Sequence, residues 1–195
     1  MDVRSAKRAL RRRAAAIRRE ALARGRDEIA ARVCRNLLAE SAIAAASRVV
    51  LYAALPDEVA SRPLFEALCA AGHTCLFPRI DPGGRLVFSL TARWEDLAPG
   101  RHAVLEPPID AEVVTPGPED VVVVPGVAFD CSGNRLGRGA GCYDRAFPTG
   151  AVAAPILVGM ACQAQIVASV PHDSRDRAMD AIVTERAFQW TRGER

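Results

Sequence analysis

The chain has 195 residues, of which 50% are hydrophobic and 25% charged, and its formal net charge is +3. A chain of this size can bury one substantial core, so we expect a single domain over residues 1–195. No window approaches the roughly 18–20 consecutive apolar residues that a membrane-spanning helix needs, which excludes an integral membrane protein and gives no reason to expect a membrane partner.

The basic charge is concentrated near the N-terminus. Residues 1–26 contain ten Lys or Arg against two acids, a net charge of +8, so the remainder carries −5. An acidic body with one basic helix indicates either an anion-binding element or an exposed charged face, whereas a uniformly basic chain would suggest nucleic acid. The six cysteines form no CxxC pair and follow no secretory segment, which predicts reduced thiols in a cytoplasmic protein.

In chain order, the predicted elements alternate between helices and strands. Apolar residues at positions 3, 6, 10, 14, 17 and 21 predict a first helix with one buried stripe, beside a basic stripe of Arg4, Lys7 and Arg11. A second helix is expected to begin near Asp27, and residues 48–55 (RVVLYAAL) predict a strand. Ser61 is expected to cap a third helix, which closes before a strand at 74–80.

The second half of the chain continues the alternation. The sequence PGG at 82–84 predicts a turn into a hairpin arm at 85–90, and the Pro-rich stretch 106–118 predicts a connection. Further strands are expected at 121–124 and 155–160, with the last strand at 181–184 and a short helix around 143–147. This order favours a three-layer α/β/α sandwich with a mainly parallel central sheet.

Residues 121–145, VVVVPGVAFDCSGNRLGRGAGCYDR, carry the strongest functional pattern. Four valines suit an inner strand covered on both faces. Glycines at 137, 139 and 141 remove Cβ atoms, so backbone N–H groups can approach an anion closely. The chain has no Gly-Lys pair, which excludes a P-loop, and Cys142 interrupts the dinucleotide pattern GxGxxG. The residues alone leave two interpretations open: a phosphate loop with Asp144 placed for a magnesium ion, or a mobile connection with a solvated Arg138.

This segment resembles the signature of the 5-formyltetrahydrofolate cyclo-ligase (methenyltetrahydrofolate synthetase) family, PGxAFDxxGxRLGxGxGYYDR. Other landmarks of that family occur in the same order: SAKRALR at 5–11, LPDEVAS at 55–61, FPRI at 77–80, LEPP at 105–108 and MDAIVTE at 179–185. The resemblance implies a sandwich of the NagB/RpiA/CoA transferase-like type. It also implies conversion of 5-formyltetrahydrofolate and MgATP to 5,10-methenyltetrahydrofolate, ADP and phosphate. The expected ligands are reduced folate, ATP as co-substrate and Mg²⁺; no nucleic acid is expected, and the protein is expected to be a monomer.

The resemblance also implies a role for individual residues. The implied ATP-binding residues are Lys7, Arg11, Arg135, Gly137, Arg138, Gly139, Gly141 and Tyr143, of which Lys7 and Arg138 are also implied to be catalytic. The implied folate-binding residues are Ala53, Glu58, Ala140 and Cys142. The implied metal ligands are Asp144 and Asp176.

Without the resemblance, several of these residues have ordinary explanations. Lys7 and Arg11 fit a solvated basic stripe, Glu58 fits an acid ahead of a helix, and Asp176 fits a surface acid between two arginines. A nucleic-acid-binding protein that uses the basic first helix is therefore a rival hypothesis.

The chain departs from the family pattern at four positions. Cys142 stands where the first of two tyrosines is usual, Ala140 replaces glycine or lysine, Arg175 replaces histidine, and Ser61 replaces threonine. These changes affect folate contacts and the surroundings of the metal more than the ATP loop. A non-catalytic or substrate-shifted paralogue that still binds nucleotide is therefore the alternative to an active ligase.

Overall fold

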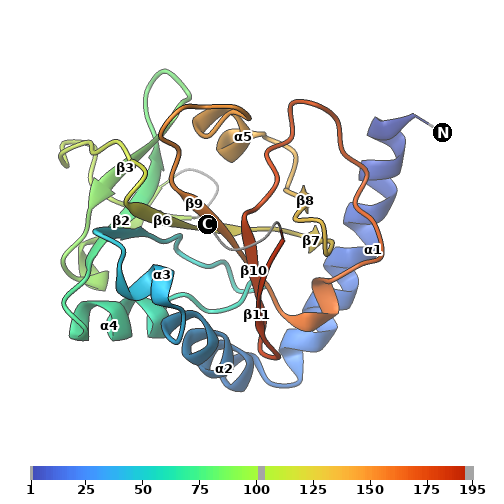
Figure 1. Ribbon diagram of the computed structural model, residues 1–195, viewed down its shortest axis with the longest axis horizontal. Coiled ribbons are helices and arrows are strands. Elements are labelled where there is room, and N and C mark those ends of the chain that lie inside the picture. The colour runs from blue at the N-terminus through green and yellow to red at the C-terminus, as the bar shows by residue number, and fades with distance from the viewer. Residues whose placement is uncertain (1, 101–103, 192–195) are drawn as a thin grey trace.

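The computed structural model describes residues 2–100 and 104–191, which are organised around a seven-stranded sheet in the order β11-β10-β9-β6-β1-β2-β3 (Figure 1). Five strands, from β10 to β2, run parallel, and the edge strands β3 and β11 are antiparallel to their neighbours. The strands of this sheet are β1 (Arg48–Val50), β2 (Thr74–Ile80), β3 (Leu86–Leu90), β6 (Asp120–Pro125), β9 (Ile156–Met160), β10 (Ala181–Val183) and β11 (Phe188–Trp190). The predicted mainly parallel α/β fold is confirmed.

Helices cover both faces of the sheet, but unequally. The helices are α1 (Val3–Ala23), α2 (Arg26–Leu38), α3 (Ser41–Ala44), α4 (Arg62–Ala70) and α5 (Cys142–Ala146). In Figure 1, α2, α3 and α4 lie below the sheet and the short α5 lies above it, while α1 runs beside a small hairpin of β7 (Ala128–Phe129) and β8 (Arg135–Leu136). A second small pair joins β4 (Ala98–Pro99) to β5 (Leu105–Glu106). Among the described residues, no helix combines the length and apolar character that crossing a membrane requires.

The valine run forms the central strand β6, as predicted. Val121 and Val123 belong to the core beneath α2 and α4, while Val122 and Val124 belong to the core on the opposite face. All four are at most 1% exposed. Because successive side chains of a strand point to opposite faces, an uninterrupted apolar run is what a doubly covered strand needs.

The strand predicted at 48–55 is wrong in length, because β1 ends at Val50. The backbone N–H groups of Ala54 and Leu55 do not continue the sheet. They donate instead to the Ser61 hydroxyl at 3.1 Å and to a Glu58 carboxylate oxygen at 2.9 Å. The chain therefore leaves the sheet early, and Ser61, which directly precedes α4, makes this contact instead of the predicted side-chain cap.

Two further predictions need correction, and one helix was not predicted. The buried stripe of α1 is Leu10, Ala14, Arg18 and Leu22, so an arginine takes a core position, whereas Ile17 is 42% exposed. The strand at 181–184 is not the last, because β11 follows it as an antiparallel edge. The short helix α3 was not predicted; one turn of four residues gives too little periodicity to detect.

Candidate active site

The carboxyl ends of β1, β2 and β6 open into one cavity of about 1180 Å³. Ligands of open α/β sheets bind at this edge, and the volume exceeds the ~300–1,000 Å³ typical of a site for one small molecule. The cavity lining includes every residue to which the sequence analysis gave a site role: Lys7, Arg11, Ala53, Glu58, Arg135, Gly137, Arg138, Gly139, Ala140, Gly141, Cys142, Tyr143, Asp144 and Asp176. Residues from distant parts of the chain thus meet in a space large enough for two ligands.

Helix α1 supplies the basic wall of the cavity. The Lys7 ammonium donates to Asp176 and lies 3.4 Å from Asp173, and its side chain is only 13% exposed. Four residues on, the Arg11 Nε donates to the Gly137 carbonyl at 2.8 Å. Neither side chain is part of a simple solvated stripe, in contrast to the exposed Arg8. The placement fits an anion-binding role and weakens the case for a nucleic-acid surface on this helix.

The glycine loop is held in shape by side chains that pack against its backbone. A Cβ on Gly137 would lie 2.7 Å from Nη1 of Arg135, so a side chain here would displace the guanidinium from its present position. Gly139 has a φ of +114°, a conformation that L-amino acids with side chains rarely adopt. Gly141 also has a positive φ, +65°, so the backbone path explains Gly139 and Gly141, and the Arg135 side chain explains Gly137.

Arg135 fastens this loop to helix α5. It is 9% exposed, its Nη2 donates to Asp144 at 3.0 Å, and its guanidinium lies 5.6 Å from the ring centroid of Tyr143. Burial raises the pKa of Tyr143, so the hydroxyl stays protonated at neutral pH. The Asp144 carboxylate thus balances the charge of Arg135.

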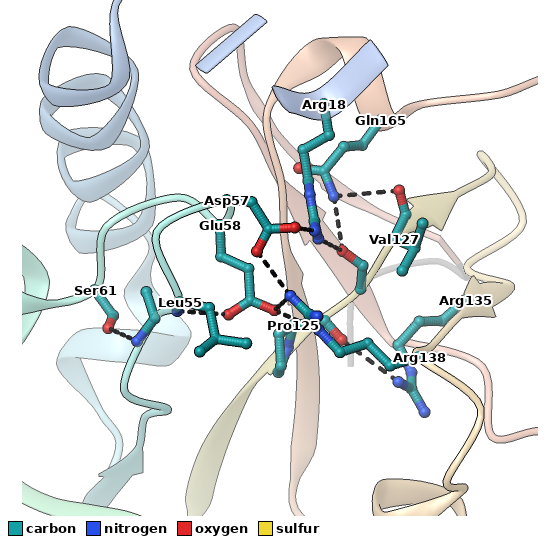
Figure 2. A network of polar contacts seen from close by, with 12 residues as sticks. Arg18, Leu55, Asp57, Glu58, Ser61, Pro125, Val127, Arg135, Arg138 and Gln165 are labelled. Carbon is teal, nitrogen blue, oxygen red and sulfur yellow. Dashed lines mark hydrogen bonds and ion pairs between the residues drawn. The ribbon is translucent and has the colours of Figure 1, made fainter. Parts of the chain in front are cut away.

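Arg138 is paired with two acids that follow β1, as Figure 2 shows. Its Nη2 donates to Asp57 at 2.8 Å, and its Nε lies 3.3 Å from an oxygen of Glu58. The Arg138 side chain is 51% exposed, whereas that of Glu58 is 8% exposed. The arginine is the more exposed partner, so its guanidinium is the group of this pair that a ligand in the cavity can reach.

A second arginine, Arg18, is buried and also pairs with Asp57. Arg18 is 1% exposed, its Nη2 pairs with Asp57, and its Nη1 donates to the Gly126 carbonyl at 3.1 Å (Figure 2). Gln165 donates to the same carbonyl at 2.8 Å. Partial burial alone would raise the pKa of Asp57, but Arg18 and Arg138 outweigh it and hold the pKa below its ordinary value of 3.8. This network was not predicted from the sequence, because a single arginine within an arginine-rich helix carries no signal.

The two predicted metal ligands lie in the cavity, each beside a cation. Asp144 pairs with Arg135 and accepts from the backbone N–H of Arg177 at 3.2 Å; Asp176 pairs with Lys7. Over residues 2–100 and 104–191, no three His, Cys, Asp or Glu side chains are grouped closely enough to hold a metal ion by themselves. The donors suit magnesium, which takes one or two carboxylates and completes its shell with phosphate oxygens and water.

Near β2 and β3 the cavity lining includes several apolar residues, to which the sequence had suggested no site role. It includes Tyr52 after β1, Pro78 and Ile80 at the end of β2, and Leu86 at the start of β3. The cavity lining also includes Arg79, a charged residue with no predicted role, which is 7% exposed. The sequence FPRI had marked this segment as a landmark, but its residues were given no role.

The departures from the family pattern occupy different environments. Cys142 lines the cavity, with its sulfur 3.8 Å from Nη2 of Arg145, so the missing tyrosine removes an aromatic surface from the cavity wall. The Arg175 side chain is 86% exposed and lies 3.4 Å from Asp173. Both residues line the cavity, and the change at 142 removes an aromatic surface from its wall, whereas the change at 175 introduces an exposed arginine.

Comparisons with known proteins show similarity to one enzyme family over most of the chain. A model of the 5-formyltetrahydrofolate cyclo-ligase family matches residues 3–185. A 5-formyltetrahydrofolate cyclo-ligase of Escherichia coli is 30% identical over 168 residues, which cover 84% of this chain and 92% of the relative. One from Mycolicibacterium smegmatis is 32% identical over 148 residues, covering 71% and 73%. The solved structure of Aquifex aeolicus 5,10-methenyltetrahydrofolate synthetase superposes with a TM-score of 0.82 at 29% identity, over 97% of this chain and 94% of that one.

Proposed function

Because the chain belongs to the 5-formyltetrahydrofolate cyclo-ligase family, we propose that it is a ligase that uses ATP to cyclise 5-formyltetrahydrofolate to 5,10-methenyltetrahydrofolate, releasing ADP and phosphate. The observation that carries the proposal is the meeting of α1, the glycine loop and the segment after β1 around one cavity. The comparisons do not favour the non-catalytic alternative, since the relatives are named for this reaction over most of the chain.

The chemistry explains why this cavity needs both cations and a carboxylate. A formamide carbon is a poor electrophile, so its oxygen attacks the γ-phosphorus of ATP and ADP leaves. Nitrogen 10 of the folate then attacks the activated carbon, the ring closes, and the C–O bond breaks as phosphate departs. Transfer of this kind depends on positioning and on neutralising charge on the phosphoryl oxygens.

In this proposal Lys7, Arg11 and Arg138 bind the triphosphate, and the glycine loop presents backbone N–H groups to it. Lys7 and Arg138 neutralise charge on the transferred group. When Arg138 leaves Glu58 for a phosphate oxygen, the Glu58 carboxylate gains acceptor capacity for the N–H edge of the pterin. The positions of these residues in the cavity support the assignment.

The proposal includes magnesium held by Asp144 and Asp176. Bound there with ATP, the ion would offset phosphate charge during transfer. Both carboxylates lie in the cavity beside the glycine loop and α1, and oxygen donors are what magnesium prefers.

We further propose a single-domain, monomeric, cytoplasmic protein. All six cysteines are free, which suits a reducing compartment. Light scattering after size-exclusion chromatography tests the oligomeric state, and a mass about twice 20.9 kDa would contradict the monomer.

A direct turnover assay tests the function. The protein is mixed with 5-formyltetrahydrofolate and MgATP, and the near-ultraviolet band of the methenyl product is followed while ADP is counted in parallel. We expect equal amounts of the two products. ADP without methenyl product would mean a different acceptor, and neither product would mean a protein that no longer catalyses the reaction.

A further inference from the structure

Arg79, at the end of β2, is a buried cation with unsatisfied donors. It is 7% exposed, and neither its Nε nor its Nη1 has a hydrogen-bond partner among the described residues. The other deeply buried arginines differ, since Arg18 pairs with Asp57 and Arg135 with Asp144. Arg79 lines the cavity, next to Pro78 and Ile80.

An unpaired guanidinium is an expensive group to keep in a protein interior. Removing a charge from water costs several kcal/mol unless an opposite charge or a set of hydrogen bonds replaces the solvent. The neighbouring cavity residues Ile80 and Leu86 show that this wall accepts apolar side chains, so packing alone gives no reason for an arginine. A ligand that brings an anionic group into the cavity would supply the missing partner.

The position of Arg79 in the sheet points away from the phosphates of ATP. The glycine loop follows β6, whereas Arg79 belongs to β2, two strands further along in the order β6-β1-β2. Neighbouring strands lie about 4.8 Å apart, so the ends of β6 and β2 are separated by roughly 10 Å. The strand between them leads to Glu58, the proposed pterin ligand. A folate with its pterin beside Glu58 and its formyl group toward the phosphates can extend its tail toward β2 and β3.

We propose that Arg79 binds a carboxylate of the glutamyl tail of the folate substrate. This inference rests on the proposed function and assigns a further binding residue to the same cavity. The tail carboxylates are the anionic groups of the folate, and a guanidinium binds a carboxylate through two parallel hydrogen bonds. The apolar side chains of Ile80, Leu86 and Val104, which line the same cavity, provide surface for the ring that precedes the tail.

Calorimetric binding of two ligands, one with and one without the glutamyl tail, tests whether Arg79 binds the tail carboxylate. The first is 5-formyltetrahydrofolate, and the second is 5-formyl-6-methyltetrahydropterin, which lacks the aminobenzoyl-glutamate tail. For Arg79→Gln we expect the Kd of the folate to rise about 30-fold or more, as for loss of one partner of a buried charge pair. The Kd values of the tailless pterin and of a non-hydrolysable ATP analogue should stay within about 2-fold of wild type. In turnover, KM for folate should rise while kcat changes little.

Two further variants make the test specific. Arg79→Lys keeps the charge but loses the paired hydrogen bonds, so an intermediate loss of folate affinity is expected. Arg85→Gln removes an exposed arginine of the same hairpin, which pairs with Asp81, and should leave folate binding unchanged. The ligand-free Arg79→Gln protein should melt at or above the temperature of the wild type, because no internal partner is lost. A lower melting temperature with unchanged folate affinity would assign Arg79 a structural role and overturn the inference.

The remaining outcomes are also decisive. Equal weakening of both ligands would place Arg79 against an oxygen of the pterin and overturn the carboxylate assignment. Folate binding as tight in Arg79→Gln as in wild type would overturn the inference alone. A wild-type protein that bound neither ligand would overturn the proposed function, and the inference with it.

Discussion

Replacing Asp57 with asparagine should destabilise the protein by about 1–2 kcal/mol at pH 7. Asp57 joins the buried Arg18, whose side chain is 2% exposed, to the half-exposed Arg138. Removing one partner of a fully buried ion pair costs about 3–5 kcal/mol. The value is smaller here because the Asp57 side chain is 30% exposed, and because the amide oxygen of asparagine still accepts a hydrogen bond.

Urea unfolding followed by tryptophan fluorescence measures this loss, since Trp94 and Trp190 are both partly buried. A loss of 1–2 kcal/mol corresponds to a melting temperature lower by about 2–8 °C for a chain of this size. The matched control is Glu28→Gln, which removes an acid from the exposed pair with Arg32 and should cost no more than about 0.5 kcal/mol. Equal stability of the two variants would refute the view that Arg18 depends on Asp57.

The effect should also depend on pH, with a sign that follows from the lowered pKa of Asp57. A carboxyl group whose pKa is lower in the folded state stabilises the fold above its unfolded value, about 3.9, and loses this effect as the pH falls through its folded value. The stability difference between wild type and Asp57→Asn should therefore be full at pH 7 and smaller at pH 3. A difference that grew on acidification would contradict the assignment.

Three more predictions concern packing, the metal and the thiols. In Gly159→Ala the new Cβ would lie 2.5 Å from the ring of Phe129, so we expect a loss of about 1–3 kcal/mol in urea unfolding, and adding Phe129→Leu should give less than the sum of the single losses. Asp144→Asn should lower turnover and raise the magnesium concentration needed for ADP release; normal activity at low magnesium would remove this residue from the metal site. Burial raises the pKa of Cys75 to about 12, so a thiol-disulfide reagent at pH 8 should label the exposed Cys131 in the native protein and Cys75 only after unfolding.

Much of the fold follows from local patterns that the sequence displays directly. The run Val121–Val124 identifies a doubly covered strand, and the periodicity of residues 26–38 identifies α2. The glycine spacing after β6 predicts a backbone exposed to a ligand, and the cavity has this backbone in its lining. Such features depend on neighbouring residues in the chain, so one sequence is enough to find them.

The misses share a different physical origin. The burial of Arg18 depends on Asp57 and on the Gly126 carbonyl, 39 and 108 residues away in the chain. After the early end of β1, the backbone N–H groups of Ala54 and Leu55 donate to the side chains of Ser61 and Glu58 instead of to a neighbouring strand. Arg79 shares a face of β2 with the buried Cys75 and Phe77, and no local pattern marks it as a ligand-binding residue. In each case the deciding contact is between a side chain and a partner outside the local pattern.

The pairing of charges in the cavity bears on how ATP and magnesium would bind. Lys7 pairs with Asp176 and Arg135 with Asp144, so proposed phosphate-binding cations neutralise the proposed metal ligands. A triphosphate alone would take the cations and leave two carboxylates unpaired beside its own negative charge. Magnesium alone would take the two carboxylates and leave Lys7 and Arg135 without their partners. We therefore expect a non-hydrolysable ATP analogue to bind at least about 10-fold more tightly with magnesium than without, a coupling of about 1.4 kcal/mol. In Asp144→Asn the ratio between the affinities for the ATP analogue with and without magnesium should shrink, because one carboxylate no longer needs a new partner. An unchanged ratio would contradict this exchange of charges.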